Sequence, residues 1–316
     1  MWWRGKPLRL PTAVNVFDVG CRDGFQMEKQ FIPTSEKVAI VNRLARLGFR
    51  KMEITSFVSP RAVPQMQDAA LVVAGAERVA GVTYAALVPN MKGAQRALET
   101  GVDELNVVFS VSESHNRANL RMPVADSLKN VADVISLARD QGGKPVNVSL
   151  ATSFGCPFEG EVPRERVLKL AREALAMGAA SLSFADTTGM ANPRQVYELL
   201  GSFRDQFPDV QVTLHFHNTR AMGMANILAG LQAGVTNFDA ALGGLGGCPF
   251  APGASGNVAT EDVVHMLEEM GISTGIDLDG LLETARYLEK VIGRTLPGQI
   301  MKAGKVKDLH PLACEQ

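Results

Sequence analysis

The chain has 316 residues, of which 46% are hydrophobic and 21% are charged, and its formal net charge is −1 at pH 7. This balance gives no basis for a nucleic-acid partner or a membrane surface, and no apolar run has the length of a membrane-spanning helix. The four cysteines lack the spacing of a zinc site. We therefore expect reduced thiols and a cytoplasmic protein with a large hydrophobic core.

Short β-rich runs alternate with amphipathic segments along the chain. The runs VNVFDV, VTYAALV and ELNVVFS are continuously apolar or β-branched, as expected of strands that are buried on both faces. We predict eight strands, which begin near Val14, Lys51, Val82, Glu104, Val146, Ser181, Val212 and Thr236. We predict helices over residues 35–47, 91–100, 124–140, 163–177, 193–207 and 221–233.

Strand–helix alternation repeated eight times is typical of a parallel (β/α)8 TIM barrel. A doubly wound open sheet is the alternative. No boundary or linker interrupts residues 14–260, and residues 261–316 have the pattern of one or two helices and a tail. We therefore predict a single domain over residues 1–316, with a barrel over 14–260 and a C-terminal helical extension over 261–316.

The unusual polar residues follow the predicted strands. They are, in chain order, Arg22 and Asp23, Glu53 and Ser56, segment 112–116, Asp186 and Thr187, His215 and His217, and segment 243–257. Barrel chemistry takes place at the C-terminal ends of the strands. We therefore expect these segments, which are scattered in the sequence, to converge at one mouth of the barrel.

His215 and His217 form the sharpest local signal. Residues i and i+2 of a strand face the same way, so both imidazoles would point into the barrel mouth and could share a metal ion. Hydrogen bonding of both rings within a polar barrel end is the alternative. Asp23 would add a carboxylate, and this donor set without a nearby thiolate suits Mg²⁺, Mn²⁺ or Fe²⁺ better than structural zinc.

Three further charged residues have two interpretations each. Arg22 forms either a surface ion pair with Asp23 or a set of fixed donors for an oxyanion. Glu53 lies in the apolar run KMEIT, where a buried carboxylate needs a partner such as Arg22. Glu53 is then either a structural counter-ion or a shared catalytic group. Asp186 would orient an active-site histidine or the substrate.

The segment 243–257 is rich in glycine and carries Cys248 next to Pro249. Glycine permits both hinge motion and close approach of the backbone to a ligand, so the segment is either a flexible connector or a lid. Cys248 is correspondingly either an incidental thiol or one that the lid carries to the site. The GxxxxGK[ST] pattern of a phosphate-binding loop is absent.

With these residues assembled, the sequence resembles the 3-hydroxy-3-methylglutaryl-CoA lyases, which belong to the metal-dependent TIM-barrel lyases with an Arg-Asp motif after strand one. The resemblance covers roughly residues 14–300. It rests on DVGCRDGFQMEK (18–29), MEITSFVSPRAVPQMQD (52–68), FGCPFEG (154–160), FADTTG (184–189), HFHNT (215–219) and the stretch 244–275. The cysteine-containing loop in the last stretch separates the lyases from most of their condensing relatives.

The resemblance implies a role for each matching residue. It implies a divalent cation, Mg²⁺ or Mn²⁺, held by Asp23, His215, His217 and Asn257. It implies catalytic roles for Arg22, Asp23, Glu53, His215 and Cys248, and substrate binding by Gln26, Ser56, Asp186 and Thr187. It also implies an acyl-CoA substrate, a homodimer, and cleavage of 3-hydroxy-3-methylglutaryl-CoA to acetyl-CoA and acetoacetate by metal-assisted retro-Claisen chemistry.

Some residues depart from the family pattern and leave the acyl group open. Cys21 replaces the usual proline before Arg-Asp, Phe25 and Met27 replace the usual leucine and asparagine, and Asn218 replaces the usual aspartate. The alternatives are a lyase for citramalyl-CoA or a longer-branched homologue, or a synthase that runs in the condensing direction. Outside this chemistry, a non-catalytic barrel that binds acyl-CoA or metal and a non-haem iron oxygenase are the rivals.

Overall fold

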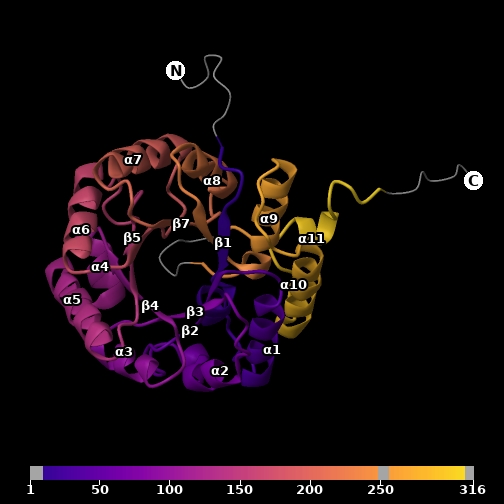
Figure 1. Cartoon of the computed structure of the whole chain (residues 1–316), viewed down its shortest axis with the longest axis horizontal. Coiled ribbons are helices and arrows are strands. Elements are labelled where there is room, and N and C mark those ends of the chain that lie inside the picture. Colours follow the sequence, from indigo (N-terminus) through magenta and orange to yellow (C-terminus); the bar gives the residue numbers. More distant parts are fainter. Residues whose placement is uncertain (1–9, 248–255, 310–316) are drawn as a thin grey trace, which may run out of the picture.

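The computed structural model describes residues 10–247 and 256–309. Within them, eight parallel strands close into a barrel in chain order, surrounded by helices (Figure 1). The strands are β1 (Asn15–Asp18), β2 (Lys51–Ser56), β3 (Thr83–Leu87), β4 (Glu104–Ser110), β5 (Val146–Ala151), β6 (Ser181–Asp186), β7 (Val212–Phe216) and β8 (Asn237–Ala240). Because β1 pairs with both β2 and β8, the sheet has no open edge. The barrel prediction is confirmed, and the doubly wound alternative is wrong.

The helices around the barrel include two that the sequence analysis did not predict, α2 and α4. The other six lie within a few residues of the predicted ranges. In chain order they are α1 (Thr34–Ala45), α2 (Ala69–Gly75), α3 (Met91–Leu98), α4 (Glu113–Leu120), α5 (Val124–Asp140), α6 (Arg164–Ala176), α7 (Pro193–Gln206) and α8 (Gly223–Gln232).

Alternate residues of each strand face the helices and the barrel interior. In β5, Val148 and Leu150 are fully buried members of the apolar core. The intervening Asn147 and Ser149 are also buried, but they make hydrogen bonds to side chains of neighbouring strands. The interior of the barrel is therefore partly polar.

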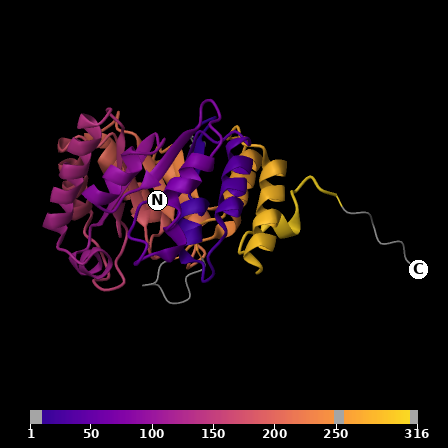
Figure 2. The same ribbon diagram turned by 90° about the horizontal axis from the view of Figure 1, so that it is seen from below.

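The C-terminal extension is helical as predicted, but its described part has three helices where one or two were expected: α9 (Thr260–Glu269), α10 (Leu278–Ile292) and α11 (Ile300–Ala303). Of these helices, α10 lies beside α1 in both ribbon views, and α9 and α11 pack on α10 (Figures 1 and 2). The Asp277 N–H donates to the Leu47 carbonyl at 2.8 Å, and the Tyr287 hydroxyl donates to Glu36. In the described part of the chain, no helix has both the length and the apolar character needed to cross a membrane.

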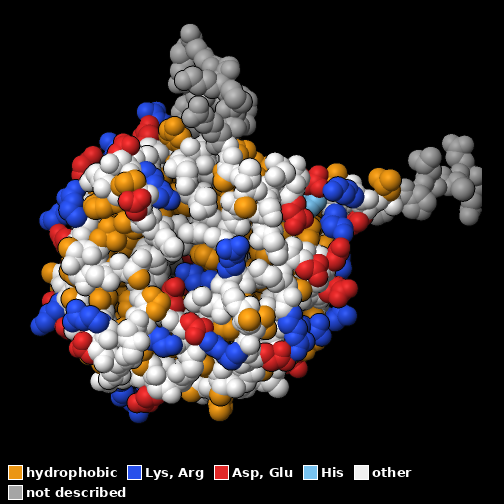
Figure 3. Space-filling view, viewed as in Figure 1, with side chains coloured by type: hydrophobic (Ala, Val, Ile, Leu, Met, Phe, Trp, Pro, Cys, Tyr) orange, Lys and Arg blue, Asp and Glu red, His pale blue; other side chains and the backbone are white. Residues whose placement is uncertain are grey.

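The face at which the strands begin is hollowed. A cavity of about 440 Å³ there is lined by charged side chains, among them Lys51, Glu104 and Arg204. Basic and acidic side chains border the hollow at the centre of the ring in the space-filling view (Figure 3). The polar residues that follow the strands meet at the opposite face.

Candidate active site

Arg22 and Asp23 lie in a tight turn directly after β1. The chain leaves the strand in a single π-helical turn, Gly20–Gly24, whose five residues are all buried. The Asp23 N–H donates to the Val19 carbonyl at 2.7 Å. A Cβ atom at Gly20 would lie 2.9 Å from the backbone nitrogen of Leu242, so glycine permits the close approach of this turn to the exit of β8. The Arg-Asp pair is thus held by backbone packing.

Asp23, His215 and His217 form a buried cluster whose candidate ligand atoms all lie within 4.8 Å of one another. Asp23 Oδ2 lies 4.0 Å from His215 Nε2 and 3.7 Å from His217 Nε2. The two histidines face the same way from β7, as their i, i+2 spacing predicts.

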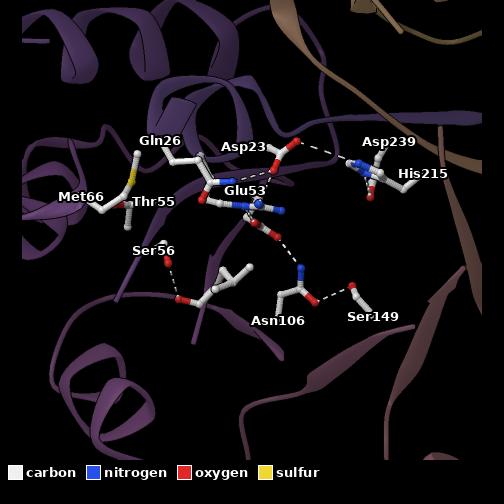
Figure 4. Close-up of polar contacts among 12 residues, drawn as sticks. Asp23, Gln26, Glu53, Thr55, Ser56, Met66, Asn106, Ser149, His215 and Asp239 are labelled. Atoms are coloured by element: carbon white, nitrogen blue, oxygen red, sulfur yellow. Dashed lines mark hydrogen bonds and ion pairs between the residues drawn. The ribbon is translucent and has the colours of Figure 1, made fainter. Parts of the chain in front are cut away.

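Asp239 of β8 supports His215 from behind. Its Oδ2 lies 3.3 Å from His215 Nδ1, and Figure 4 shows His215 between Asp239 and Asp23. A carboxylate at Nδ1 places the proton there and leaves the Nε2 lone pair facing Asp23. Burial alone would lower the pKa of His215, but the hydrogen bond and charge of Asp239 and the charge of Asp23 raise it. One carboxylate and two imidazole nitrogens, one of them oriented in this way, fit a divalent cation.

Asn257 is the fourth residue predicted for the metal site, and the structure brings it to the cluster. An antiparallel bridge pairs it with His217. Its Nδ2 donates to Asp23 Oδ2 at 2.7 Å and to the Leu245 carbonyl at 2.9 Å. The nitrogen of the amide therefore faces Asp23, whereas Oδ1 is the atom that could ligate a cation.

Arg22 lies between two carboxylates and is buried, with 9% of its surface exposed. Its Nη1 lies 2.5 Å from Asp23 Oδ1, and its Nε donates to Glu53 Oε1. Burial tends to raise the pKa of Asp23, but Arg22 and the two histidines outweigh it and lower that pKa. The surface ion pair considered for Arg22 and Asp23 is therefore wrong.

Glu53 is buried in β2, and both of its oxygens accept hydrogen bonds. Oε1 accepts from Arg22, and Oε2 accepts from Asn106 Nδ2 at 2.5 Å. Burial raises the pKa of Glu53, and Asp239 adds to this effect, while Arg22 and Asn106 oppose it. The partner predicted for this buried carboxylate is thus confirmed to be Arg22.

Of the four predicted substrate-binding residues, Gln26 makes a hydrogen bond to the cluster: its Nε2 donates to Asp23 Oδ1 at 2.9 Å (Figure 4). Asp186 accepts from the backbone N–H groups of Met190 and Ala191 through Oδ1, while its buried Oδ2 has no hydrogen-bond partner among the described residues. Burial raises the pKa of Asp186.

The other two make hydrogen bonds with neighbouring backbone. The Ser56 hydroxyl donates to the Leu87 carbonyl at 3.3 Å and is fully buried. Thr187 Oγ1 accepts from the Thr152 N–H at 2.8 Å. Cys248 lies outside the described residues.

The sequence analysis missed several polar residues at this end of the barrel. In the barrel interior, Asn106 donates to Glu53 and Asp239 lies against His215, while Asn147 and Ser149 donate to Asn106. Their signal is a polar residue at alternate positions of an otherwise apolar strand. Thr152 after β5 is a second omission. It has a φ of 57°, which is rare for a β-branched residue and typical of functional sites.

A closed parallel barrel with a buried Asp-His-His cluster beside a carboxylate-paired arginine defines a class of barrel enzyme with a metal-binding group at the C-terminal ends of its strands. Residues 13–288 match the model of the HMGL-like family, and the chain belongs to this family. It is therefore an acyl-CoA carbon–carbon lyase, and the oxygenase and the non-catalytic barrel are excluded.

Close relatives cover almost the whole chain. Hydroxymethylglutaryl-CoA lyase YngG of Bacillus subtilis is 44% identical over 295 residues, which are 93% of this chain and 98% of the relative. The (R)-citramalyl-CoA lyase of Chloroflexus aurantiacus is 43% identical over 305 residues, with coverage of 93% and 96%. An HMG-CoA lyase structure from Acinetobacter baumannii, in complex with coenzyme A and 3-methylmalate, has a TM-score of 0.92 and 45% identity and covers 96% of this chain and 98% of that one.

Proposed function

We propose that this lyase cleaves 3-hydroxy-3-methylglutaryl-CoA to acetyl-CoA and acetoacetate. The observation that carries the proposal is the buried Arg22 next to the Asp23, His215 and His217 cluster. This arrangement places a permanent cation beside a metal-binding group. A reaction that forms an enolate next to a chelated hydroxyl requires both. The B. subtilis relative, named for this activity, adds support.

Asp23, His215 and His217 would hold Mg²⁺ or Mn²⁺, and Asn257 would join them if its Oδ1 faced the cluster. A divalent cation held by these residues would supply Lewis-acid chemistry, orienting the tertiary hydroxyl of the substrate and lowering its pKa. We propose His215 or Asp23 as the acceptor of the hydroxyl proton. The unpartnered Asp186 Oδ2 is available to bind a substrate hydrogen-bond donor.

Loss of the hydroxyl proton lets the C2–C3 bond break. The bonding electrons move onto the thioester carbonyl, which becomes the enolate oxygen of acetyl-CoA, and C3 becomes the ketone carbon of the second product. The Arg22 guanidinium would donate to the enolate oxygen as its charge develops. A proton returned to C2 completes the reaction without a net gain or loss of protons. We propose Cys248 as the group that relays this proton.

A second candidate substrate is (R)-citramalyl-CoA, because the C. aurantiacus relative named for it is nearly as similar as the B. subtilis one. The two thioesters share the C3 hydroxyl and differ in the groups on C3, so the same site chemistry could cleave both. Phe25 and Met27, which depart from the family pattern, belong to the short 3-10 helix that carries Gln26. Phe25 is buried, and Met27 is exposed.

The ratio of kcat/KM for the two thioesters tests the choice of substrate. The purified protein with Mn²⁺ would be given each one, and acetoacetate or pyruvate would be measured next to acetyl-CoA. We expect 3-hydroxy-3-methylglutaryl-CoA to have the higher kcat/KM by at least about tenfold, the effect of roughly 1.4 kcal/mol in transition-state binding. A ratio in the other direction would replace the proposed substrate with citramalyl-CoA.

Three further expectations stay predictions. They are the single domain over residues 1–316, the homodimer and the cytoplasmic location. One calorimetric unfolding transition and a sedimentation mass of twice the chain mass of 33.9 kDa are the results expected for the first two. Fractionation of the source cells checks the third.

A further inference from the structure

A chain of hydrogen-bonded side chains crosses the barrel interior behind Glu53. Glu53 of β2 accepts from Asn106 of β4, whose Oδ1 in turn accepts from Asn147 Nδ2 at 3.0 Å and from Ser149 Oγ at 2.9 Å. Asn147 Oδ1 accepts from Ser181 Oγ at 2.8 Å. All five residues are buried, and Figure 4 shows Asn106 between Glu53 and Ser149.

These hydrogen bonds allow only one orientation of the Asn106 side-chain amide. The ion pair with Arg22 favours the ionised form of Glu53, and an ionised carboxylate can only accept hydrogen bonds. Asn106 must therefore turn its NH₂ group toward Glu53, and its carbonyl oxygen must accept from elsewhere. Asn147 and Ser149 supply those two donors. In this orientation each of these hydrogen bonds joins a donor to an acceptor. A reversed Asn106 amide would instead place its oxygen against an oxygen of Glu53.

We propose that Asn106 is a positioning residue for the lyase reaction, holding Glu53 as a pure hydrogen-bond acceptor so that Glu53 aims the Arg22 guanidinium. Glu53 is then the counter-ion of Arg22 and takes no part in proton transfer. The inference deepens the proposed function and rests on it, because Arg22 acts there on the enolate oxygen. It decides between the two roles that the sequence left open for Glu53.

The surroundings of Glu53 explain why such a donor is needed. Burial and the charge of Asp239 both favour a protonated Glu53, which would bind Arg22 less strongly. The charged groups that face Glu53 are Arg22 from the β1 turn and Asp239 from β8, and the Lys51–Glu104 ion pair lines the same interior cavity of about 20 Å³. The Asn106 amide is the neutral donor that joins Arg22 in holding the charge on Glu53.

Replacement of Asn106 by leucine tests this role. Asn106→Leu removes the donor at similar volume, so we expect kcat to fall by roughly 10–100-fold, as with other partners that orient active-site groups, and KM to change far less. Loss of a hydrogen bond to the charged form raises the pKa of Glu53, so the acidic limb of the kcat/KM profile should move to higher pH. A merely structural role would lower the rate without moving this limb.

Asn237→Leu is the matched control. Asn237 lies at the start of β8 and accepts from Asn15, without contact to Glu53, so its loss should leave the acidic limb at the wild-type pH. Ser149→Ala keeps Asn106 but removes one of the donors that orient it, and a smaller shift in the same direction is expected. This variant carries the test if Asn106→Leu does not fold. An acidic limb unmoved in the folded variants would overturn the proposal.

Infrared spectroscopy separates this inference from the proposed reaction. At the pH of the shifted acidic limb, the difference spectrum of Asn106→Leu against the wild type should show an additional protonated-carboxyl band, which is lost again in Asn106→Leu with Glu53→Gln. If the wild type cleaves no thioester but the band appears, the reaction is wrong and the positioning of Glu53 stands. If the wild type is active and no band appears, the positioning role is rejected.

Discussion

Arg22 is a buried cation between the carboxylates of Asp23 and Glu53, and its side chain has little freedom to move. An arginine held in this way presents its remaining N–H groups in a fixed direction, so no reorganisation is needed when negative charge develops on a substrate. Burying three charges is costly unless each finds a partner. The arrangement is therefore better explained by chemistry than by stability.

Arg22→Gln should abolish most of the turnover. The neutral amide removes the guanidinium charge, and loss of one such donor typically lowers kcat by about 10²–10³-fold. Metal content, measured by elemental analysis, should stay close to that of the wild type because Asp23, His215 and His217 remain. Activity within about tenfold of the wild type would rule out a role for Arg22 at the enolate.

His217→Ala should weaken metal binding. Its Nε2 is one of the three atoms that converge in the cluster, and two ligands bind a cation less tightly than three. Titration calorimetry with Mn²⁺ measures the loss, which we expect to be at least about 10-fold. His265→Ala on α9, outside the cluster, is the control and should bind Mn²⁺ as the wild type does. Equal affinity in both variants would exclude His217 as a ligand.

At this scale the sequence predicted polar residues at or just after the strand ends, together with Glu53, and missed the other polar residues inside the barrel. Arg22, Asp23, His215 and His217 stand out because polar residues at strand ends and an i, i+2 pair are local patterns. The only local signal of Asn106 is a polar residue in an otherwise apolar strand, which does not show what it contacts. Its importance depends on the register that pairs it with Asn147 across β4 and β5, which only the closed sheet defines.

At the scale of elements, the segment that begins at Gly256 forms one side of the site. The Gly256 carbonyl accepts from the Asn218 N–H at 2.9 Å, next to the bridge between His217 and Asn257. Gly256 has a φ of 101°, and a Cβ atom there would lie 2.2 Å from the Gly244 carbonyl oxygen. The backbone segments at Gly244 and Gly256 are thus in such close contact that only glycine fits at position 256.

Gly256→Ala should therefore both destabilise the protein and weaken metal binding. Gly271→Ala is a matched control, because Gly271 also has a positive φ, of 74°, but has no described atom within 4 Å of the added Cβ. Strain alone costs about 1–2 kcal/mol, which both variants share in a chemical denaturation experiment. The additional loss of stability and of Mn²⁺ affinity in Gly256→Ala measures the clash. Equal effects in the two variants would contradict this account of the segment.

The start of α9 carries a buried acid. Glu261 Oε2 accepts from the Gly243 N–H at 3.0 Å, and burial raises the pKa of Glu261 to about 8. The folded protein thus keeps this proton up to about pH 8, while the unfolded chain releases it above its ordinary pKa of 4.5. The stability from this group is fully present below pH 4.5 and is lost as the pH rises through 8.

Glu261→Gln has no proton to release, so its free energy of unfolding should rise relative to the wild type between about pH 5 and pH 8. One proton gives a slope of at most about 1.4 kcal/mol per pH unit. Urea denaturation at several pH values measures the difference between the two proteins. Glu269→Gln, an exposed position of the same helix, is the control and should show little pH dependence. A pH-independent difference for Glu261→Gln would refute the buried-acid assignment.

Two helices could not be predicted from their own residues. The sequence of α2, AALVVAG, is apolar throughout and lacks helical periodicity. The α4 sequence, ESHNRANL, is short and polar, and its best signal is the Ser112 side chain, which accepts from the His115 N–H at 3.1 Å as an N-cap. Longer amphipathic helices such as α5 and α10 carry a clear pattern and pack an apolar face.

For the molecule as a whole, the sequence predicted the barrel because eight repeats of one pattern admit few topologies. It could not place the C-terminal helices. The position of α10 beside α1 depends on contacts such as that between Asp277 and Leu47, which are distant in sequence. The strand ends bring together residues from position 22 to position 257, so the site exists only in the closed barrel.

The most direct test is product formation from 3-hydroxy-3-methylglutaryl-CoA by the purified protein, with Mg²⁺ or Mn²⁺ and with EDTA as the control. The account predicts release of acetyl-CoA and acetoacetate in equal amounts, at rates typical of enzymes of about 1–10³ s⁻¹, and loss of this activity in EDTA. If folded, metal-loaded protein releases neither product, or if EDTA has no effect, the account is contradicted.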